Sequence, residues 1–389
     1  MSTTTHHDVV IVGGGNAGLS LAGRLHRDGA RDVVVVEPED VHHYRPMLSY
    51  VAGGQASLTQ LRRPQDEVTP DGVGRVRGRV VRVDADRRLV HLESGGTLHY
   101  NDLALCPGSS VDWDAVPGSA DAVATGHAAT SYLPDSAVRT WEMLAGLTAG
   151  RAVFVMDDRH VPCAPVALKP LFLALAHWRA TGVREAIDVE LLVAGPRLVD
   201  LARADSVLHD AAIAQGVRVR YGVVVSGVEA AGRTLTLRDA DPTGTASTTN
   251  HAPVPYDALY LAPPHRAPDW IATSGLAVEP DGSDGGGPDA GFLLVDPGTL
   301  QHPDHPRIWG LGDVAALDAL PSGARCASRS RWWRRTSPRA VGARPTSPTT
   351  ATRSPRWSPG RATSCSPSST GRARSSRPCP SWTWSAPVR

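Results

Sequence analysis

The sequence predicts an α/β protein with two three-layer units, each built on a parallel sheet between layers. Three observations support this fold class. Apolar strands alternate with helical stretches in two separate blocks, residues 8–38 and 151–194. A glycine-rich turn joins strand to helix in the first block. The length of 389 residues exceeds one ordinary domain and is enough for two hydrophobic cores.

The first block opens with a short apolar strand, Asp8–Val12, followed by the turn GGGNAG over residues 13–18. A helical pattern covers residues 19–27, and a second strand over residues 32–36 ends at Glu37. This order of strand, turn, helix, strand and terminal acid is typical of a Rossmann-like dinucleotide-binding unit. A glycine turn without function is the alternative, and the surrounding elements make it the weaker interpretation.

The turn residues have separate expected roles. Gly13 permits the tight turn, Gly15 lets the backbone approach a pyrophosphate, and Gly18 lets helix and strand pack closely. The N-terminus of the helix then faces the phosphate charge. A carboxylate at Glu37 can accept hydrogen bonds from adenosine ribose hydroxyls, which favours FAD or NAD over a cofactor with a 2′-phosphate.

Two later strands are expected to complete the walls of the same site. One covers residues 100–105 and ends at Cys106-Pro107-Gly108, and the other covers residues 307–311 and ends at Gly312-Asp313. Asp313 is placed where flavoproteins hold the ribityl hydroxyls of FAD with a carboxylate. Its alternative role, as N-cap of a helix over residues 314–316, is compatible with the same position.

The second block lacks the glycines that the first block has. A strand over residues 151–156, a helix over 165–181 and a strand over 188–194 form another strand–helix–strand unit, but the turn 157–165 contains no glycine. NADH binding is therefore disfavoured there. The turn instead offers one thiol, Cys163, ahead of the helix, with Lys169 inside it. A helix N-terminus favours the reactive thiolate, although an isolated cysteine is more often a buried apolar residue.

Composition excludes several classes of protein. Five cysteines without paired spacing give neither a secreted disulfide framework nor a zinc site. No stretch approaches the roughly 20 apolar residues that span a bilayer, and the first residues lack the pattern of a signal peptide. We therefore expect a cytosolic protein without a bound metal. Histidine, lysine and arginine side chains outside the motifs are expected on solvated faces.

The C-terminal segment differs in composition from the rest. Residues 324–389 hold 14 arginines, five tryptophans and no aspartate or glutamate, which leaves residues 1–323 with 26 basic and 39 acidic residues, a formal charge of −13. Such a segment cannot build an ordinary core. Three interpretations compete: a disordered basic tail, a tether to nucleic acid or membrane, and translation in the wrong reading frame.

From His6 to Gly323 the chain resembles the sulfide:quinone oxidoreductases, particularly the branch shared by mitochondria and many bacteria, and more distantly flavocytochrome c sulfide dehydrogenase. The resemblance rests on several nearly gapless blocks. These are Ile11-Val12-Gly13-Gly14-Gly15, the stretch from Val35-Val36-Glu37-Pro38 through His43-Tyr44-Arg45-Pro46, Pro162-Cys163-Ala164 with Lys169, Asp257 through Pro263, Leu300-Gln301-His302, and Gly310 through Asp313.

The resemblance implies an FAD-dependent enzyme that takes two electrons from sulfide and passes them to a quinone. Cys163 matches the family cysteine that carries a persulfide, and quinone as a substrate implies contact with the inner face of a membrane. Nucleic acid is not an expected partner. The implied cofactor-binding residues are Gly13, Gly15, Asn16, Gly18, Glu37, Arg45, Val80, Gly108 and Asp313.

One position departs from the family. The second redox cysteine is expected directly after the Gly-Asp pair, where this chain has Val314. Cys106 matches a position beside the cofactor and is not an evident replacement. Two alternative functions therefore stay open: a flavin-dependent NADH:quinone or ferredoxin-type reductase, which the glycine-free turn disfavours, and a non-catalytic or degenerate flavoprotein.

The genetic code supports a frameshift near Gly323. Reading one nucleotide earlier allows residues 349–360 to become YDGYTVAPVVTG, which resembles the family's C-terminal region, and two further segments give family-like sequences in order. Cys326, Cys365 and Cys379 would then be artefacts. We expect an FAD-binding domain from residues 1–145 and 285–323, a second Rossmann-like domain over 146–284, and a disordered, out-of-frame tail over 324–389.

Overall fold

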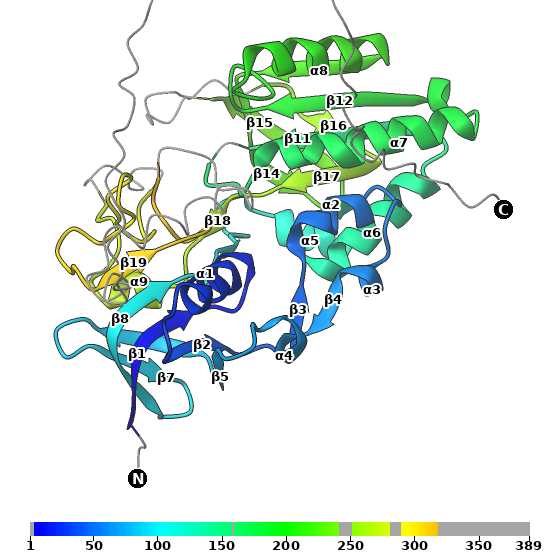
Figure 1. Ribbon diagram of the computed structural model, residues 1–389. Coiled ribbons are helices and arrows are strands. Elements are labelled where there is room, and N and C mark those ends of the chain that lie inside the picture. The colour runs from blue at the N-terminus through cyan, green and yellow to red at the C-terminus, as the bar shows by residue number, and fades with distance from the viewer. Residues whose placement is uncertain (1–3, 158, 241–250, 281–288, 318–389) are drawn as a thin grey trace, which may run out of the picture. The chain divides into compact units, whose positions relative to one another are not determined.

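The computed structural model describes residues 4–157, 159–240, 251–280 and 289–317. Two sheets organise these residues, one mainly of strands drawn in blue and cyan in Figure 1 together with the yellow β19, and one mainly of strands drawn in green. The predicted α/β fold class is confirmed. The predicted tail lies outside the described residues, and the domain boundaries at residues 145 and 284 remain a prediction.

The first sheet has the strand order β5-β2-β1-β8-β7-β6, and β19 pairs with the carboxyl end of β8. β1 pairs in parallel with both β2 and β8, whereas β7 pairs antiparallel with both of its neighbours. Continuous apolar runs such as that of β2 fit strands that are buried on both faces. The bounds are β1 Thr4–Val12, β2 Val33–Glu37, β5 Gly74–Arg77, β6 Val80–Asp84, β7 Leu89–Leu92, β8 Thr97–Leu105 and β19 Ile308–Gly310.

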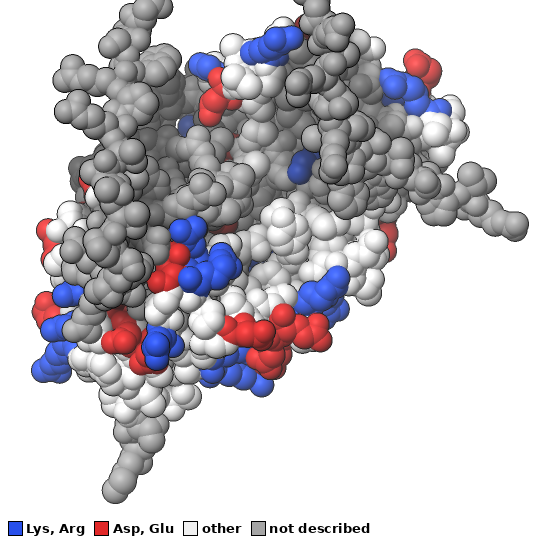
Figure 2. Space-filling model, viewed as in Figure 1, with Lys and Arg blue, Asp and Glu red and all other residues white. Residues whose placement is uncertain are grey.

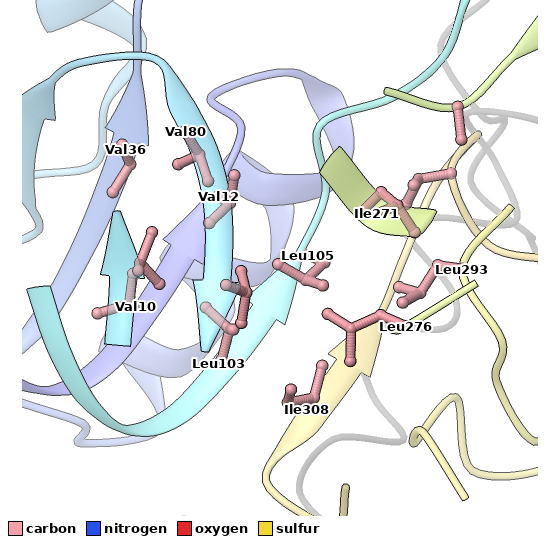
Figure 3. Packing of buried hydrophobic residues seen from close by; sticks show 14 of the residues in the cluster. Val10, Val12, Val36, Val80, Leu103, Leu105, Ile271, Leu276, Leu293 and Ile308 are labelled. Carbon is pink, nitrogen blue, oxygen red and sulfur yellow. The ribbon is translucent and has the colours of Figure 1, made fainter. Parts of the chain in front are cut away.

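Both faces of this first sheet are covered. Helix α1 (Asn16–Arg27) lies on one face, where Leu21 and Leu25 pack against Ile11. On the other face Val10 and Val12 belong to a core shared with residues from the 267–316 stretch. Figure 3 shows this core, in which Leu103, Leu105, Ile271, Leu276, Leu293 and Ile308 are labelled. Alternate residues of one strand thus reach different layers.

The second sheet is parallel throughout, with the order β10-β17-β11-β12-β13. Helices α6, α7 and α8 supply a core with Phe154 on one face, and the three-stranded sheet β14-β15-β16 and α5 pack with Val153 on the other. The bounds are β10 Ala128–Ala129, β11 Gly150–Met156, β12 Ile187–Val193, β13 Val217–Tyr221, β17 Ala258–Ala262, β14 Val223–Glu229, β15 Thr234–Asp239, β16 Val254–Pro255, α5 Ser119–Ala124, α6 Pro134–Gly146, α7 Leu168–Ala180 and α8 Ala202–Ala214.

Short elements connect the first sheet to the second sheet. β9, which follows β8, pairs with β18, which follows β17, so the chain leaving one sheet meets the chain leaving the other. A second small pair, β3 with β4, is formed by the segment that connects β2 to β5 along the chain. The bounds are β9 Ser110–Val111, β18 His265–Arg266, β3 Val41–His43, β4 Arg62–Pro64, α2 Leu48–Val51, α3 Leu58–Leu61, α4 Gln65–Val68, α9 Trp270–Thr273, and the 3₁₀ helices η1 Arg45–Met47, η2 Ala164–Ala167 and η3 Arg184–Ala186.

Two predicted helices start differently in the structure. The first, predicted from residue 19, begins at Asn16 as α1. The second, predicted over residues 165–181, begins as the 3₁₀ helix η2 and continues as α7. As a result, Cys163 precedes a short 3₁₀ helix and not the N-terminus of the α-helix itself.

Acidic and basic side chains meet on the surface. Figure 2 shows red and blue side chains side by side on the face in view. Among the ion pairs, Arg75 contacts the carboxylates of both Asp40 and Asp66, at 3.0 and 2.7 Å. The carboxylates are well exposed, so these pairs contribute little to stability.

Candidate active site

The glycine turn has the tight geometry that its sequence predicts. Gly13 has a φ of 101°, and a Cβ atom there would lie 2.2 Å from the carbonyl oxygen of Cys106. A Cβ atom at Gly18 would lie 1.9 Å from the carbonyl oxygen of Gly13. Both contacts involve backbone atoms that cannot move away cheaply. Glycine at these two positions is therefore required by the fold itself.

Gly15 is different because its surroundings are open. A Cβ atom there would meet nothing within 4 Å. Gly15 is also the N-cap of α1, and no side chain caps that helix end. The first N–H groups of α1, beginning at Asn16, therefore have room for an external acceptor. This arrangement fits the pyrophosphate of a dinucleotide, since the helix N-terminus favours negative charge.

Glu37 fixes the turn from the end of β2. Its Oε2 accepts a hydrogen bond of 2.7 Å from the N–H of Gly14, and its Oε1 accepts one of 2.9 Å from the N–H of Glu39. The buried Gln65 donates from Nε2 to the carbonyl oxygen of Gly14, at 2.9 Å. Gln65 could not be found from the sequence, because a glutamine in a connecting segment carries no local signal of a contact 51 residues away.

The other predicted cofactor residues lie in different settings. Arg45 is exposed in η1, and Gly108 follows β8 with a φ of 74° and open space around its Cβ position. The side chain of Val80, by contrast, is buried in the core of the first sheet. Only the backbone of Val80 is therefore available to a ligand.

Asp313 lies in the turn after β19, and its expected alternative role as a helix N-cap is wrong. Residues 314–316 are not helical: Ala315 forms a parallel bridge with Leu293, and the N–H of Leu293 donates to the carbonyl oxygen of Val314 at 2.9 Å. Burial raises the pKa of the Asp313 carboxyl, while the positive charge of Arg45 acts in the opposite direction.

Cys163 has an unusual backbone conformation. Its φ is 55°, in the left-handed region that non-glycine residues rarely adopt, and it is the N-cap of η2. Although Cys163 is exposed as a residue, the surrounding protein removes enough water to raise the pKa of its thiol. Asp313 also raises this pKa, whereas Lys169 and the N–H of Val166 lower it. The expectation that the helix end would favour thiolate is therefore wrong in its net direction, because desolvation outweighs the short η2 turn.

Tyr132 and His265 complete the surroundings of the thiol. The hydroxyl of Tyr132 donates to the carbonyl oxygen of Pro162 at 3.0 Å, and its ring meets that of His265 edge-on, with centroids 4.9 Å apart. Burial lowers the pKa of His265 to about 4. The expectation of a solvated face is wrong for this histidine, which is 6% exposed.

The two positions considered for a second redox cysteine, 314 and 106, are both buried. Val314 is fully buried in the core of the first sheet, so an aliphatic side chain occupies the place where the resemblance implied a second redox cysteine. Cys106 is 5% exposed at the carboxyl end of β8 and packs in the core beneath α1. Cys163 is thus the accessible thiol of the described residues.

The glycine-free turn after β11 carries a buried acid. Asp157 is 3% exposed and accepts hydrogen bonds from both the N–H and the guanidinium of Arg159. A carboxylate at the strand end repels phosphate, and the neighbouring guanidinium is already engaged with it. This geometry disfavours a second dinucleotide at the position where such units usually bind one.

Comparison with known proteins agrees with this geometry. The family model of the pyridine nucleotide-disulphide oxidoreductases matches residues 7–136. The mitochondrial sulfide:quinone oxidoreductase of Mus musculus is 28% identical over 326 residues, covering 84% of this chain and 69% of the relative. That of Dictyostelium discoideum is 28% identical over 325 residues, covering 83% and 68%. The structure of the sulfide:quinone oxidoreductase from Aquifex aeolicus shares the fold, with a TM-score of 0.69 at 17% identity, covering 84% of this chain and 74% of the other.

The fold, the glycine turn and these matches define an FAD-dependent oxidoreductase of the pyridine nucleotide-disulphide class. The open space at Gly15 fits the cofactor. Within that class, the chain is similar to the sulfide:quinone oxidoreductases. Among the described residues, no helix is both long enough and apolar enough to cross a membrane.

Proposed function

We propose that this chain oxidises sulfide at Cys163 and passes two electrons through FAD to a quinone. One observation carries the proposal. Cys163, from the turn after β11 of the second sheet, lies close enough to Asp313, after β19 of the first sheet, for the carboxylate to raise the pKa of the thiol. The residue matched to the family persulfide and the residue matched to the FAD ribityl contact thus come from different sheets to one place.

The proposed reaction joins two sulfur atoms. Hydrosulfide and the Cys163 thiol form one sulfur–sulfur bond, which yields a persulfide and releases two electrons and one proton. FAD, held by the glycine turn and Asp313, would supply the acceptor for these two electrons, and a quinone would be their final acceptor. A thiolate acceptor then attacks the outer sulfur of the persulfide, takes it as its own persulfide, and leaves Cys163 as a thiolate.

The residues around the thiol control its charge. The raised pKa keeps Cys163 protonated near neutral pH, so the attacking species is hydrosulfide or a small fraction of thiolate. Lys169 and the N–H of Val166 favour the anionic sulfur that the transfer step releases. The hydroxyl of Tyr132 donates a hydrogen bond to the carbonyl oxygen of Pro162 and so restrains the residue just before Cys163.

The proposal needs only one cysteine. Because Val314 replaces the second redox cysteine and is fully buried, no protein disulfide can form at that position. The sulfur of Cys163 must therefore pass directly to an external acceptor rather than to a partner thiol. We further propose that the cofactor contacts are made by Gly13, Gly15, Asn16, Gly18, Glu37, Arg45, the backbone of Val80, Gly108 and Asp313.

Flavin absorbance under anaerobic conditions tests the proposal. Sulfide should bleach the oxidised flavin band of the wild-type protein, and Cys163→Ala should abolish this bleaching while Cys106→Ser keeps it. A quinone should then restore the band. Bleaching by NADH alone would favour the alternative reductase, and bleaching by neither reagent would leave a flavoprotein without this chemistry.

A quinone substrate also bears on location. We propose a cytoplasmic protein that contacts the inner face of the membrane, where quinones dissolve. We expect flotation with liposomes to detect this contact, and to detect it more strongly if the frame after residue 323 is restored. The frameshift itself is decided by sequencing the gene, since stop codons in the shifted frame across residues 324–389 would rule it out.

A further inference from the structure

The loop that carries Cys163 has a strained backbone. His160 and Cys163 have φ values of 46° and 55°, and they are two of the five non-glycine residues with positive φ in the described part of the chain. Each such conformation is unfavourable for a residue with a side chain and persists only where neighbouring groups hold it. Something must therefore fix the 160–163 loop.

The contacts of His160 provide that restraint. Its ring stacks on the ring of Phe292 with centroids 3.7 Å apart and planes 13° apart. Its Nε2 donates a hydrogen bond to the carboxylate of Asp289. Phe292 is 3% exposed and belongs to the core of the first sheet. The loop follows β11 of the second sheet, yet its histidine is anchored on the core of the first.

We propose that His160 is a positioning residue for Cys163, which it serves by anchoring the 160–163 loop to Asp289 and Phe292. Without this anchor the loop would be free to relax toward ordinary backbone conformations, and the thiol would leave its place beside Asp313. The inference rests on the proposed function only for its kinetic consequence. The anchor itself is a claim about where the thiol stands.

The charged surroundings of the thiol predict what release of the loop would do. Three titratable groups lie near enough to interact electrostatically with Cys163: Lys169 of α7, Asp313 after β19, and Tyr132 ahead of α6. In the anchored loop, desolvation and Asp313 together outweigh Lys169 and raise the pKa of the thiol. A released loop would return the pKa toward its ordinary value, so more thiolate would be present near neutral pH.

Alkylation and flavin reduction test the anchor together in the FAD-loaded full chain. We would prepare His160→Ala and Asp289→Asn, with His251→Ala as the matched control. His251 also pairs with an aspartate, at 2.7 Å from Asp239, but belongs to the β14-β15-β16 region. The readouts are the pH dependence of iodoacetamide alkylation at Cys163, the rate of flavin reduction against sulfide concentration, the FAD content and the melting temperature.

We expect both anchor variants to alkylate several-fold faster at neutral pH than the wild type and to shift the alkylation profile to lower pH. We expect flavin reduction at saturating sulfide to slow roughly 10- to 100-fold, as for a misplaced reacting group, with the half-saturating concentration changed less than about two-fold. FAD content should stay at the wild-type level, and His251→Ala should behave as wild type throughout.

Wild-type alkylation profiles in both anchor variants would overturn the inference. If His160→Ala fails to fold, Asp289→Asn, which keeps the size of the side chain, decides the question alone. If sulfide does not reduce the wild-type flavin, the proposed function fails, and the alkylation profiles by themselves then support or overturn the anchor.

Discussion

The carboxylate of Glu37, at the end of β2, accepts a 2.7 Å hydrogen bond from the N–H of Gly14, in the turn before α1. This contact ties the acid that is expected to hold the ribose to the turn that is expected to hold the pyrophosphate. The two ends of a dinucleotide-binding unit are thus fixed by one carboxylate. Its second oxygen is restrained in turn by the N–H of Glu39.

Replacing Glu37 should therefore weaken FAD binding more than its ribose contact alone would suggest. Glu37→Ala removes a charged acceptor and leaves the Gly14 N–H without that partner, a loss of about 1.5–3 kcal/mol for a hydrogen bond to a charged group. We expect the Kd for FAD, measured by fluorescence titration, to rise roughly ten-fold or more. Glu39→Ala, which removes an exposed neighbouring carboxylate, is the control and should leave the Kd nearly unchanged.

The glycines of the turn should separate into two classes. Gly18→Ala would place a Cβ atom 1.9 Å from a backbone oxygen, so the fold should lose stability. Gly15→Ala meets nothing within 4 Å and should leave the apoprotein stable, yet its methyl group would occupy the space for the pyrophosphate. We expect a lower apoprotein melting temperature only in Gly18→Ala, and loss of FAD in Gly15→Ala. Retention of FAD by Gly15→Ala would place the pyrophosphate elsewhere.

Local pattern was enough to predict the first dinucleotide unit. The residues of β1, the turn and α1 are contiguous, and the order of the glycines alone implies the steric need for Gly13 and Gly18 and the open space at Gly15. The start of α1 was misplaced by three residues because the turn residues Asn16 to Gly18 already adopt helical conformation. Helix onset depends on backbone geometry that apolar periodicity does not record.

Contacts between residues far apart in the sequence could not be predicted in this way. Gln65, the anchor of His160 on Phe292, and the burial of His265 all depend on residues more than 50 positions apart. The direction of the Cys163 pKa was missed for the same reason, because the desolvating neighbours and Asp313 come from distant segments. The sequence identified Cys163 as the candidate thiol, but it could not predict which distant residues shift the pKa of that thiol.

Burial of His265 should make stability depend on pH. Its pKa is lowered to about 4 in the folded chain from an ordinary value of 6.5, so between these values the unfolded chain binds more protons. Stability should therefore rise with pH through this window, and the contribution present above pH 6.5 should be lost as pH falls toward 4. The full shift corresponds to about 3 kcal/mol.

Melting temperatures between pH 4 and 7 check this linkage. His265→Gln should flatten part of the pH dependence, whereas His127→Gln, which changes an exposed histidine, should leave it intact. Equal slopes in His265→Gln and the wild type would mean that other groups, such as carboxylates, dominate the acid loss of stability.

Lys169 is the single lysine in a chain with 39 arginines, and its charge lies where it lowers the pKa of Cys163. Its Nζ stands 4.8 Å above the ring centroid of Tyr50, an exposed contact that restrains the ammonium near the start of α7. Removing the charge in Lys169→Met should raise the thiol pKa further. Alkylation of Cys163 near neutral pH should then slow roughly two- to ten-fold, as expected for a pKa rise of up to one unit.

Lys169→Arg separates charge from the identity of the side chain. Arginine keeps a positive charge and can stack on Tyr50, so alkylation should stay near the wild-type rate if charge alone matters. Because the guanidinium spreads its charge over a larger and more weakly hydrated group, sulfur transfer to an external thiol can fall even where alkylation does not. Wild-type alkylation in Lys169→Met would instead show that desolvation and Asp313 set the reactivity of Cys163 without help from the lysine.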